Sequence, residues 1–408
     1  MIVLAGGDLV LPDRVLSGAS LVIDAGRVAA IEPRGRVDAG GATFVDVRGL
    51  WVVPGFIDVH VHGVDGVDTL DAGDPIADMA ARLPQYGVTA FCPTTVACPP
   101  AALRAVLGAV AQARAARLPA SARVLPAHLE SNFINPEYRG AQPAECLRLP
   151  DPASAFAKAG TSREAGRHAP DGEFSGRDIL DVIAAARPDV GIVTLAPELP
   201  GGLDLVRSLV RSGHRVSLGH SGASLDETMA AIDAGARHAA HLFNRMTPIT
   251  HRSPGIAGAI LVRDEVAAEL ISDGYHVHPA MSRVAIASKG TDRIMAVTDG
   301  TAGAGLPVGS EARLGGRRIR VTGTGAVLDE GTLAGSTLTM DRAFGTIVSV
   351  FGFSVVEAAI MCSTTPAREL GLTGLGLIAE GAVADVVVLD RGFRVVRTLI
   401  DGRDVFSR

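Results

Sequence analysis

Residues 54–63 read Pro-Gly-Phe-Ile-Asp-Val-His-Val-His-Gly, and they continue an apolar run that begins at Leu50. This stretch predicts a buried strand over residues 51–59. Side chains on a strand alternate between its two faces, so positions i and i+2 point the same way. We therefore expect His60 and His62 to project together from the carboxyl end of the strand. Two imidazoles held in this way can bind one divalent cation. A surface strand with two solvated histidines is the alternative for such a pair taken alone.

The composition favours a large globular protein. The chain has 408 residues, of which 47% are hydrophobic and 20% charged, enough for a barrel of about 250 residues with a satellite domain. The net charge of −6 without a basic cluster argues against a nucleic-acid partner. No uninterrupted apolar run reaches the length of about 18 residues that a membrane span needs, and residues 1–10 do not resemble a signal peptide. We predict a cytoplasmic protein with no membrane partner and with four reduced cysteines.

Strands alternate with helices after residue 50. Eight such units in order are typical of an α/β fold of the (β/α)8 TIM barrel type. A doubly wound sheet is the alternative, but it rarely has eight regular repeats. The predicted strands are residues 51–59, 88–93, 123–129, 190–196, 215–219, 238–242, 266–272 and 293–298.

Both ends of the chain have a different pattern, with short strands and tight turns. Residues 19–31 predict a hairpin with Ala25-Gly26 as its turn. The end of the chain, from residue 381 onward, has the same character, so the two termini are expected to form one small β-sandwich domain. The predicted domain limits are 1–53 for the first part of the sandwich, 54–378 for the barrel and 379–408 for the second part.

Three further segments complete the predicted organisation. Residues 150–175 are polar and weakly patterned, which indicates a loop insertion after the third barrel strand. Residues 313–328 predict a β-hairpin, and residues 341–370 predict helices. The insertion is expected on the catalytic face of the barrel, where it would help to shape a pocket.

Residues able to bind a metal follow several of the predicted strands. Catalytic groups of a barrel lie at the carboxyl ends of different strands, and four of the 11 histidines fall at such ends. Each of these residues alone is an ordinary polar side chain at a loop boundary, but together they predict a metal site. They are His60 and His62 after the first strand, Glu130 after the third, His220 after the fifth, His241 after the sixth and Asp299 after the eighth.

The motifs around these residues resemble those of one protein family. They occur in the same order as in that family and span nearly the whole chain. This is the N-acetylglucosamine-6-phosphate deacetylase family of the amidohydrolase superfamily. The resemblance implies a metal-dependent hydrolase that converts N-acetylglucosamine 6-phosphate to glucosamine 6-phosphate and acetate. The matching motifs are residues 54–63, His128-Leu129-Glu130, Leu195-Ala196-Pro197-Glu198, Gly219-His220-Ser221, 241–246, 252–259, 273–277, 297–300 and 333–340.

The resemblance also implies a role for each of the metal-binding residues. Glu130, His220 and His241 would hold the main divalent ion, and Asp299 would be the catalytic acid and base. His60 and His62, with Glu130 bridging and Asp299 nearby, would form a second metal position. Some family members lack this histidine pair, so its presence favours two ions over one. We expect zinc, while iron, cobalt and manganese also accept such ligands.

The substrate would be held by a further set of residues, again as the resemblance implies. Arg252 and His276 would bind the phosphate, for which an arginine fork is suited. A homodimer is implied, since family members often complete the phosphate site across the subunit boundary. The remaining residues expected around the sugar and its acetyl group are Ala141, Gln142, Asn244, Arg245, Leu333, Ala334 and Gly335.

Three positions depart from the family pattern. Ser131-Asn132 stands where the family has Gly-Pro, Gln142 replaces a histidine expected near the substrate carbonyl, and Arg245 replaces an alanine beside the sugar. These changes leave open another N-acyl amino sugar, or another acidic N-acyl or cyclic amide, as the substrate. A barrel without activity that only binds a ligand is a further alternative. Glu198 is expected in the pocket without an assigned role.

Overall fold

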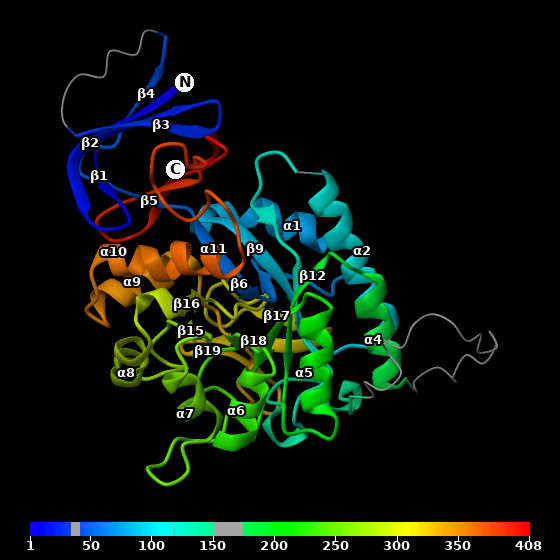
Figure 1. Ribbon diagram of the computed structural model, residues 1–408. Helices are drawn as coiled ribbons and strands as arrows, with labels where there is room; N and C mark the ends of the chain where they lie inside the picture. Colours follow the sequence, from blue (N-terminus) through cyan, green and yellow to red (C-terminus); the bar gives the residue numbers. More distant parts are fainter. Residues whose placement is uncertain (34–40, 117, 151–173) are drawn as a thin grey trace.

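Eight parallel strands form the centre of the protein, and each pairs with the next one along the chain (Figure 1). The computed structural model describes residues 1–33, 41–116, 118–150 and 174–408. The central strands are β6 (Phe56–Val61), β9 (Val88–Thr95), β11 (Ala127–Glu130), β12 (Val190–Leu195), β13 (Arg215–Leu218), β14 (His238–Ala239), β15 (Ala267–Ile271) and β16 (Ile294–Val297). A short strand, β10 (Arg123–Val124), pairs with β9 just before β11 begins.

The first and last barrel strands, β6 and β16, are joined by a few hydrogen bonds near their carboxyl ends, which close the barrel. The backbone N–H of Asp299 donates to the carbonyl of His60 at 2.9 Å, and that of His62 donates to Gly300 at 2.8 Å. Below them, the Thr298 hydroxyl donates to the buried carboxyl of Asp58 at 2.6 Å. The predicted (β/α)8 barrel is therefore confirmed, and its seam lies beside three of the candidate metal residues.

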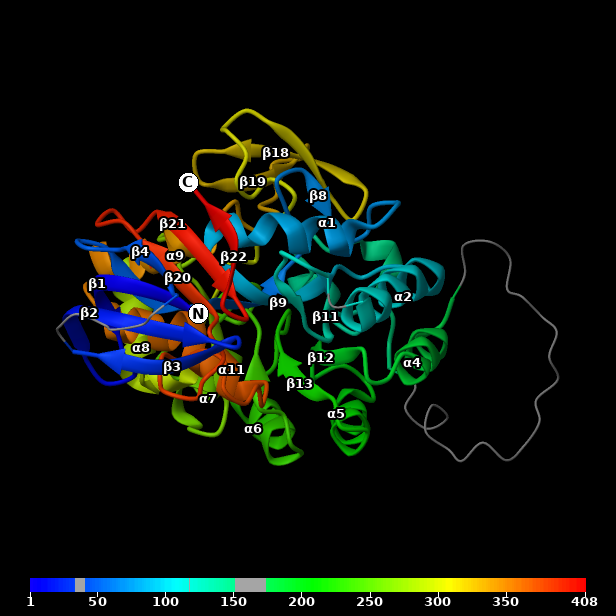
Figure 2. The same cartoon turned by 90° about the horizontal axis from the view of Figure 1, so that it is seen from above.

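Helices surround the strands on the outside of the barrel (Figure 2). Their sequences bury one face and expose the other, as α5 illustrates: Leu205, Val206 and Leu209 are buried, while Arg207 and Arg211 are exposed. The helices of the barrel are α1 (Pro75–Arg82), α2 (Pro100–Ala116), α4 (Gly176–Ala185), α5 (Gly202–Arg211), α6 (Leu225–Asp233), α7 (Gly255–Val262), α8 (Pro279–Lys289) and α9 (Met340–Ser349).

A second sheet contains both ends of the chain, which Figure 1 shows on one side of the barrel. This confirms a small domain built from the two termini, while the exact domain limits given above stay a prediction. Arg123 connects the domain to the barrel by donating to the buried carboxylate of Asp385 at 2.9 Å. The strands of this sheet are β1 (Ile2–Val10), β2 (Val15–Asp24), β3 (Arg27–Glu32), β4 (Thr43–Asp46), β5 (Trp51–Pro54), β20 (Val386–Leu389), β21 (Val395–Ile400) and β22 (Arg403–Ser407).

The single strand predicted over residues 51–59 is wrong, because it is two strands in two different sheets. β5 pairs with β20 of the small domain, whereas β6 pairs with β9 of the barrel. The chain passes from one to the other at Gly55, where a Cβ would lie 2.3 Å from the Thr89 hydroxyl oxygen. Only a glycine fits this close approach, so the break depends on a contact that local sequence does not show.

Other predicted elements differ in extent. The hairpin predicted over residues 313–328 is a three-stranded sheet of β17 (Glu311–Leu314), β18 (Arg317–Thr322) and β19 (Gly325–Leu328). A two-stranded ribbon, β7 (Gly63–Val64) and β8 (Val67–Asp68), follows β6. The helices after α9 are α10 (Val355–Ala359), the π-helical turn η5 (Ile360–Thr364) and α11 (Thr365–Glu369).

Nearly all of the insertion predicted over residues 150–175, including His168, lies outside the described residues. Among the helices in the described ranges, none combines the length and the apolar character required to cross a membrane.

Candidate metal centre

Three side chains from three strand ends meet at the carboxyl end of the barrel. Glu130 Oε1 lies 2.7 Å from His220 Nε2 and 2.8 Å from His241 Nε2. The two imidazole Nε2 atoms lie 3.0 Å apart. All three side chains are buried. The first predicted metal group is thus brought together from β11, β13 and β14.

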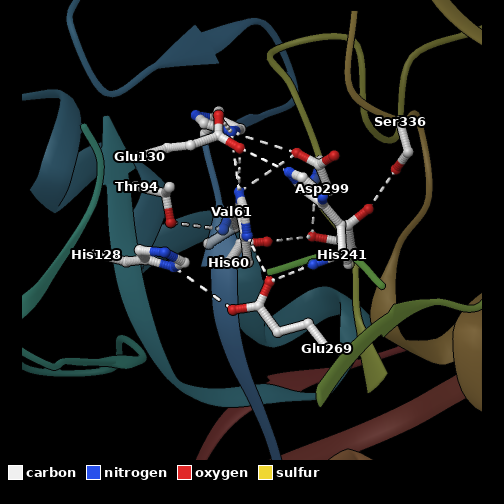
Figure 3. A network of polar contacts seen from close by, with 12 residues as sticks. His60, Val61, Thr94, His128, Glu130, His241, Glu269, Asp299 and Ser336 are labelled. Carbon is white, nitrogen blue, oxygen red and sulfur yellow. Dashed lines mark hydrogen bonds and ion pairs between the residues drawn. The ribbon is translucent and has the colours of Figure 1, made fainter. Parts of the chain in front are cut away.

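A second group lies beside the first and shares Glu130 with it (Figure 3). His60 Nε2 and His62 Nε2 are 3.2 Å apart, and Glu130 Oε2 lies 3.5 Å from His62 Nε2. Asp299 Oδ1 completes the group at 3.3 Å from His62 Nε2 and 3.6 Å from His60 Nε2. Alternation along β6 places both imidazoles on one face, as the sequence predicts.

The donor set fits a divalent cation. In each group two imidazole Nε2 atoms lie close to each other and to a carboxylate oxygen. Two neutral imidazoles whose Nε2 atoms both carry lone pairs cannot form a hydrogen bond with each other, because neither nitrogen has a proton to donate. A cation between them would accept all of these lone pairs at once. Imidazole nitrogen and carboxylate oxygen together suit zinc and other first-row metals. The residues present therefore fit a metal centre of one or two ions.

Strained backbone conformations position several of these ligands. His220 has a φ of 48°, His241 a φ of 26° and Asp299 a φ of 46°, all in the left-handed region that non-glycine residues rarely adopt. Each of the three residues lies just after its barrel strand ends, so the turn directs its side chain over the barrel mouth. Such conformations cost about 1–3 kcal/mol each and are concentrated at functional sites.

Glu269 is a residue of the site that the sequence reasoning missed. It lies on β15 and is fully buried. Its carboxylate accepts from His60 Nδ1 at 2.7 Å, from His238 Nε2 at 2.8 Å and from the backbone N–H of His241 at 3.1 Å. Figure 3 shows it on the opposite side of His60 from Glu130 and Asp299. A glutamate within the apolar run 266–271 was the signal that could have identified it.

Glu269 fixes how His60 presents its ring. Because a carboxylate can only accept a hydrogen bond, the proton of His60 lies on Nδ1 and Nε2 is directed toward the metal group. His128 lies beside this pair, with its Nδ1 3.7 Å from Glu269 Oε1, and the three residues form a third close group of possible ligands, but both ring nitrogens of His128 already have other partners. Its Nδ1 contacts the Val59 carbonyl at 2.9 Å and its Nε2 contacts the Thr194 hydroxyl at 2.7 Å.

The electrostatics keep the carboxylates of the centre ionised. Burial raises the pKa of Glu130, but His220 and His241 outweigh burial and hold that pKa well below its usual range. Asp299 behaves in the same way, with His60 and His62 lowering its pKa against burial. Carboxylates that remain charged at neutral pH are the form that binds a cation.

His60 itself carries the opposite shift. Burial lowers the pKa of its imidazole, but the charges of Glu269 and Asp299 more than compensate and raise it to about 10. In His128, by contrast, burial and the neighbouring His60 lower the pKa to about 3. Without a cation, His60 therefore holds a proton on both ring nitrogens near pH 7, and a metal ion at Nε2 would have to displace one of them, whereas His128 stays neutral.

A cavity of about 60 Å³ opens over the metal groups and contains most of the predicted substrate residues. Arg252 does not line it within the described chain, and its side chain is exposed. Ala334 is also absent from its wall, since its side chain packs in the core of the three-stranded sheet. The predicted residues that do line the cavity are His62, Glu130, Ala141, Gln142, His220, His241, Asn244, Arg245, His276, Asp299, Leu333 and Gly335.

Two of the departures from the family pattern serve the structure around this cavity. Gln142 donates to Glu130 Oε2 and accepts from the backbone N–H of Ala97 at 2.7 Å, so it orients the shared carboxylate. Asn132 donates to the carbonyls of Cys98 and Cys146 at 2.9 and 2.7 Å. Asn132 therefore fixes the loop after β11 from behind.

Arg245, the third departure, lies at the rim. Its guanidinium is exposed and packs against Gly140, where a Cβ would approach Arg245 Nε to 2.7 Å. At the same rim, Asp273 Oδ2 binds His276 Nδ1 at 2.6 Å and fixes that ring. The cavity thus has a cation and an oriented imidazole above the metal groups.

Glu198 connects the loops that frame the cavity. Its carboxylate accepts from the Asn135 amide at 2.9 Å, the Ser221 hydroxyl at 2.7 Å and the backbone N–H of Gly222 at 2.6 Å. These contacts join the loops after β11, β12 and β13. Glu198 does not line the cavity and holds its walls in place instead.

Comparison with known proteins identifies the family. Residues 51–405 match the amidohydrolase family. The chain belongs to the amidohydrolase family. A curated relative, the N-acetylgalactosamine-6-phosphate deacetylase of Escherichia coli O157:H7, is 36% identical over 95% of this chain and 95% of its own length. The N-acetylglucosamine-6-phosphate deacetylase of Lysinibacillus sphaericus is 34% identical over 93% of this chain and 91% of its own.

A solved structure extends the likeness to the fold of the whole chain. The N-acetyl-D-glucosamine-6-phosphate deacetylase D267A mutant from Mycobacterium smegmatis, in complex with N-acetyl-D-glucosamine-6-phosphate, has a TM-score of 0.86 and 31% identity. The match covers 100% of this chain and 99% of that one. This amidohydrolase is accordingly a hydrolytic enzyme with the fold of those deacetylases.

Replacing Glu269 by glutamine should weaken metal binding about 10–100-fold, because an amide cannot accept from His60, His238 and the His241 backbone equally well. The metal dissociation constant, measured by competition with a chelating dye, tests this. Glu265→Gln is the matched control, since Glu265 is exposed and its one ion pair among the described residues is with Arg263. Equal metal affinity in both variants would contradict the role given to Glu269.

The stability of the chelator-treated enzyme should fall as the pH rises from 6.5 to 10. The pKa of His60 is about 10 in the folded protein, whereas the ordinary pKa of a histidine is 6.5. The folded state therefore holds this proton more tightly, and the resulting stabilisation is complete below pH 6.5 and lost through pH 10. Thermal melts across this range, compared with His60→Gln, measure it; parallel profiles for the two proteins would disprove it.

Proposed function

We propose that this amidohydrolase removes the acetyl group from an N-acetylated amino sugar 6-phosphate, with N-acetylglucosamine 6-phosphate as the substrate and glucosamine 6-phosphate and acetate as products. The observation that carries the proposal is the convergence of Glu130, His220, His241 and Asp299 on the floor of one cavity. The named relatives act on sugars of this class, and the structural neighbour holds such a sugar phosphate.

The metal groups supply the activation of water. A divalent cation bound there would lower the pKa of a coordinated water toward about 7 and polarise the amide carbonyl. Glu130, His220 and His241 would hold one ion, and His60 and His62 with Glu130 a second. We propose zinc, with iron, cobalt and manganese as the other candidates, because nitrogen and carboxylate ligands suit each of them.

Asp299 would transfer a proton from the attacking water to the nitrogen of the departing amine. Its carboxylate is ionised, lies 3.3 Å from His62 Nε2 and faces the cavity. It can therefore accept a proton from the attacking water. Returning that proton to the amide nitrogen makes the amine a good leaving group, and general acid–base transfer of this kind contributes about 10²–10⁴-fold to a rate.

The rim would recognise the rest of the substrate. His276, held by Asp273, and the cation of Arg245 lie on the same cavity as Asn244. Ala141, Gln142, Leu333 and Gly335 add neutral surface around the sugar. Gln142 keeps its place beside Glu130, where an amide can still donate to an acetyl oxygen.

Arg252 suggests a homodimer. It is exposed, and it does not reach the cavity of its own chain in the described structure. We propose that it binds the phosphate in the site of a second copy, which would place two copies of this loop at a shared boundary. The four cysteines are free and buried, which supports the proposed cytoplasmic location.

The C4 epimer of the sugar is a second candidate substrate. The Escherichia coli relative, at 36% identity, acts on N-acetylgalactosamine 6-phosphate, and the departures at Gln142 and Arg245 lie around the same cavity. Another N-acyl amino sugar, or an acidic N-acyl or cyclic amide, is the broader alternative. None of these changes the roles proposed for the metal groups or Asp299.

Kinetics on matched substrates test the reaction. We expect the purified enzyme, with its metal content measured on the same sample, to release acetate from N-acetylglucosamine 6-phosphate far faster than from the unphosphorylated sugar. Asp299→Asn should lower kcat about 10²–10⁴-fold while keeping metal and fold, whereas Asp226→Asn, an exposed helix position, should not. Equal rates with and without the phosphate would refute the substrate, and a faster N-acetylgalactosamine 6-phosphate reaction would select the epimer.

Mixing two inactive variants tests the shared site. In a heterodimer of Arg252→Met and Asp299→Asn, one cavity combines an intact Asp299 with the Arg252 of the other subunit. We expect activity to return on refolding the two together, with up to half of the cavities restored in each mixed dimer. No recovery, despite formation of mixed dimers, would show that Arg252 does not act across the boundary.

A further inference from the structure

A second cavity lies at the opposite end of the barrel from the metal groups. Its volume is about 380 Å³, larger than that of the catalytic cavity. The segments before β11, β12 and β13 form its walls, and residues after α11 close one side. β12 and β13 are adjacent strands, with α4 and α5 outside them (Figure 2). The cavity is therefore separated from the catalytic face by the length of the strands.

Arginines dominate the charge of this cavity. Arg187, Arg215 and Arg114 all line it, but only Arg114 has a carboxylate partner among the described residues, Asp189. Arg187 lies over the loop at Gly213, where a Cβ would come within 3.5 Å of its Nη2 atom. The two other guanidiniums make no hydrogen bond or ion pair within the described chain, so the cavity carries uncompensated positive charge.

Arg215 is the more informative of the two because it is half-buried. It begins β13, and burial lowers the pKa of its guanidinium. The one carboxylate whose charge raises the pKa of Arg215, Glu369, is already paired with Arg293 at 3.5 Å and Arg368 at 3.0 Å. A half-buried cation without a partner costs stability, since its lost hydration is not replaced.

The rest of the lining is mostly apolar. Leu125, Ile192, Leu370 and Leu372 face the same space. His214 also lines it, and burial lowers the pKa of its imidazole against the opposing effect of the hydrogen bond from Nδ1 to the Val190 carbonyl at 3.0 Å. The cavity thus combines a cationic wall with an apolar one, which is the character of a site for an amphipathic anion.

A purely structural role does not account for these features. The amino end of a TIM barrel normally serves stability, yet here the half-buried Arg215 has no carboxylate partner among the described residues, which reduces stability. A bound anion would supply that partner. It would fill the space and give Arg187 and Arg215 the bidentate acceptor that a guanidinium fork suits.

We propose that this cavity binds a small organic anion, a phosphate monoester or a carboxylate, with its charged end at Arg187 and Arg215 and its apolar end on Leu370 and Leu372. The site is distinct from the catalytic cavity and independent of the reaction proposed above. Its occupation stabilises the barrel from the face opposite the metal groups.

Calorimetry with three matched probes tests the proposal on the full-length, metal-loaded enzyme. Butyl phosphate and butyrate represent the two kinds of anion, and 1-butanol is the uncharged control. The variant is Arg215→Met, which removes the charge and keeps the alkyl chain. Arg211→Met is its control, since Arg211 is exposed and does not line the cavity. Arg187→Met is a second test variant at an exposed position, should Arg215→Met not fold.

We expect at least one anion to bind the wild type and Arg211→Met, at least about tenfold more weakly to Arg215→Met or Arg187→Met, and butanol not to bind. Which anion binds identifies its kind. Without any probe, Arg215→Met should melt at or above the wild-type temperature, because the unpaired cation is gone. The proposal is overturned if neither anion binds, if butanol binds equally well, or if the arginine variants bind the anion as the control does.

Discussion

The buried carboxylate of Glu269 is the contact on which the metal centre depends. It lies on β15 and accepts from two imidazoles and a backbone N–H, on β6, on β14 and just after β14. A carboxylate with no exposed surface would be costly without such partners. With them, it orients the ring of His60 and fixes the backbone of His241, so one residue supports a histidine in each of the two metal groups.

Several residues of the site adopt conformations or contacts that lower the stability of the folded protein locally. Three ligands leave their strands in the left-handed region of φ, and two pairs of imidazole nitrogens face each other at 3.0 and 3.2 Å. The surrounding fold compensates with contacts such as those of Glu198 and Asn132, which hold the neighbouring loops from behind. The departures at Ser131 and Asn132 belong to this support, since the Ser131 hydroxyl donates to the Thr194 carbonyl.

Much of the site could be predicted from sequence, because strand alternation and the order of a barrel are local rules. His60 and His62 follow from a two-residue spacing, and Glu130, His220, His241 and Asp299 from their places after successive strands. The break at Gly55 could not be predicted, since it depends on Thr89 from another strand. The role of Glu269 could not be predicted because its three hydrogen-bond partners are distant in sequence. That Arg252 does not line the cavity could not be predicted either, because sequence alone does not show where an exposed loop lies.

The barrel seam has a consequence for how the molecule forms. The hydrogen bond between Thr298 and Asp58 joins residues that are 240 positions apart in the chain. The neighbouring backbone hydrogen bonds of His60 and His62 likewise require the last barrel strand and the residues after it. Contacts this distant in sequence form late, because the loop entropy must be overcome first. A ribosome-bound chain that has emerged only through β15 lacks both Asp299 and the seam. The complete set of candidate metal ligands therefore assembles only after β16 has joined the barrel.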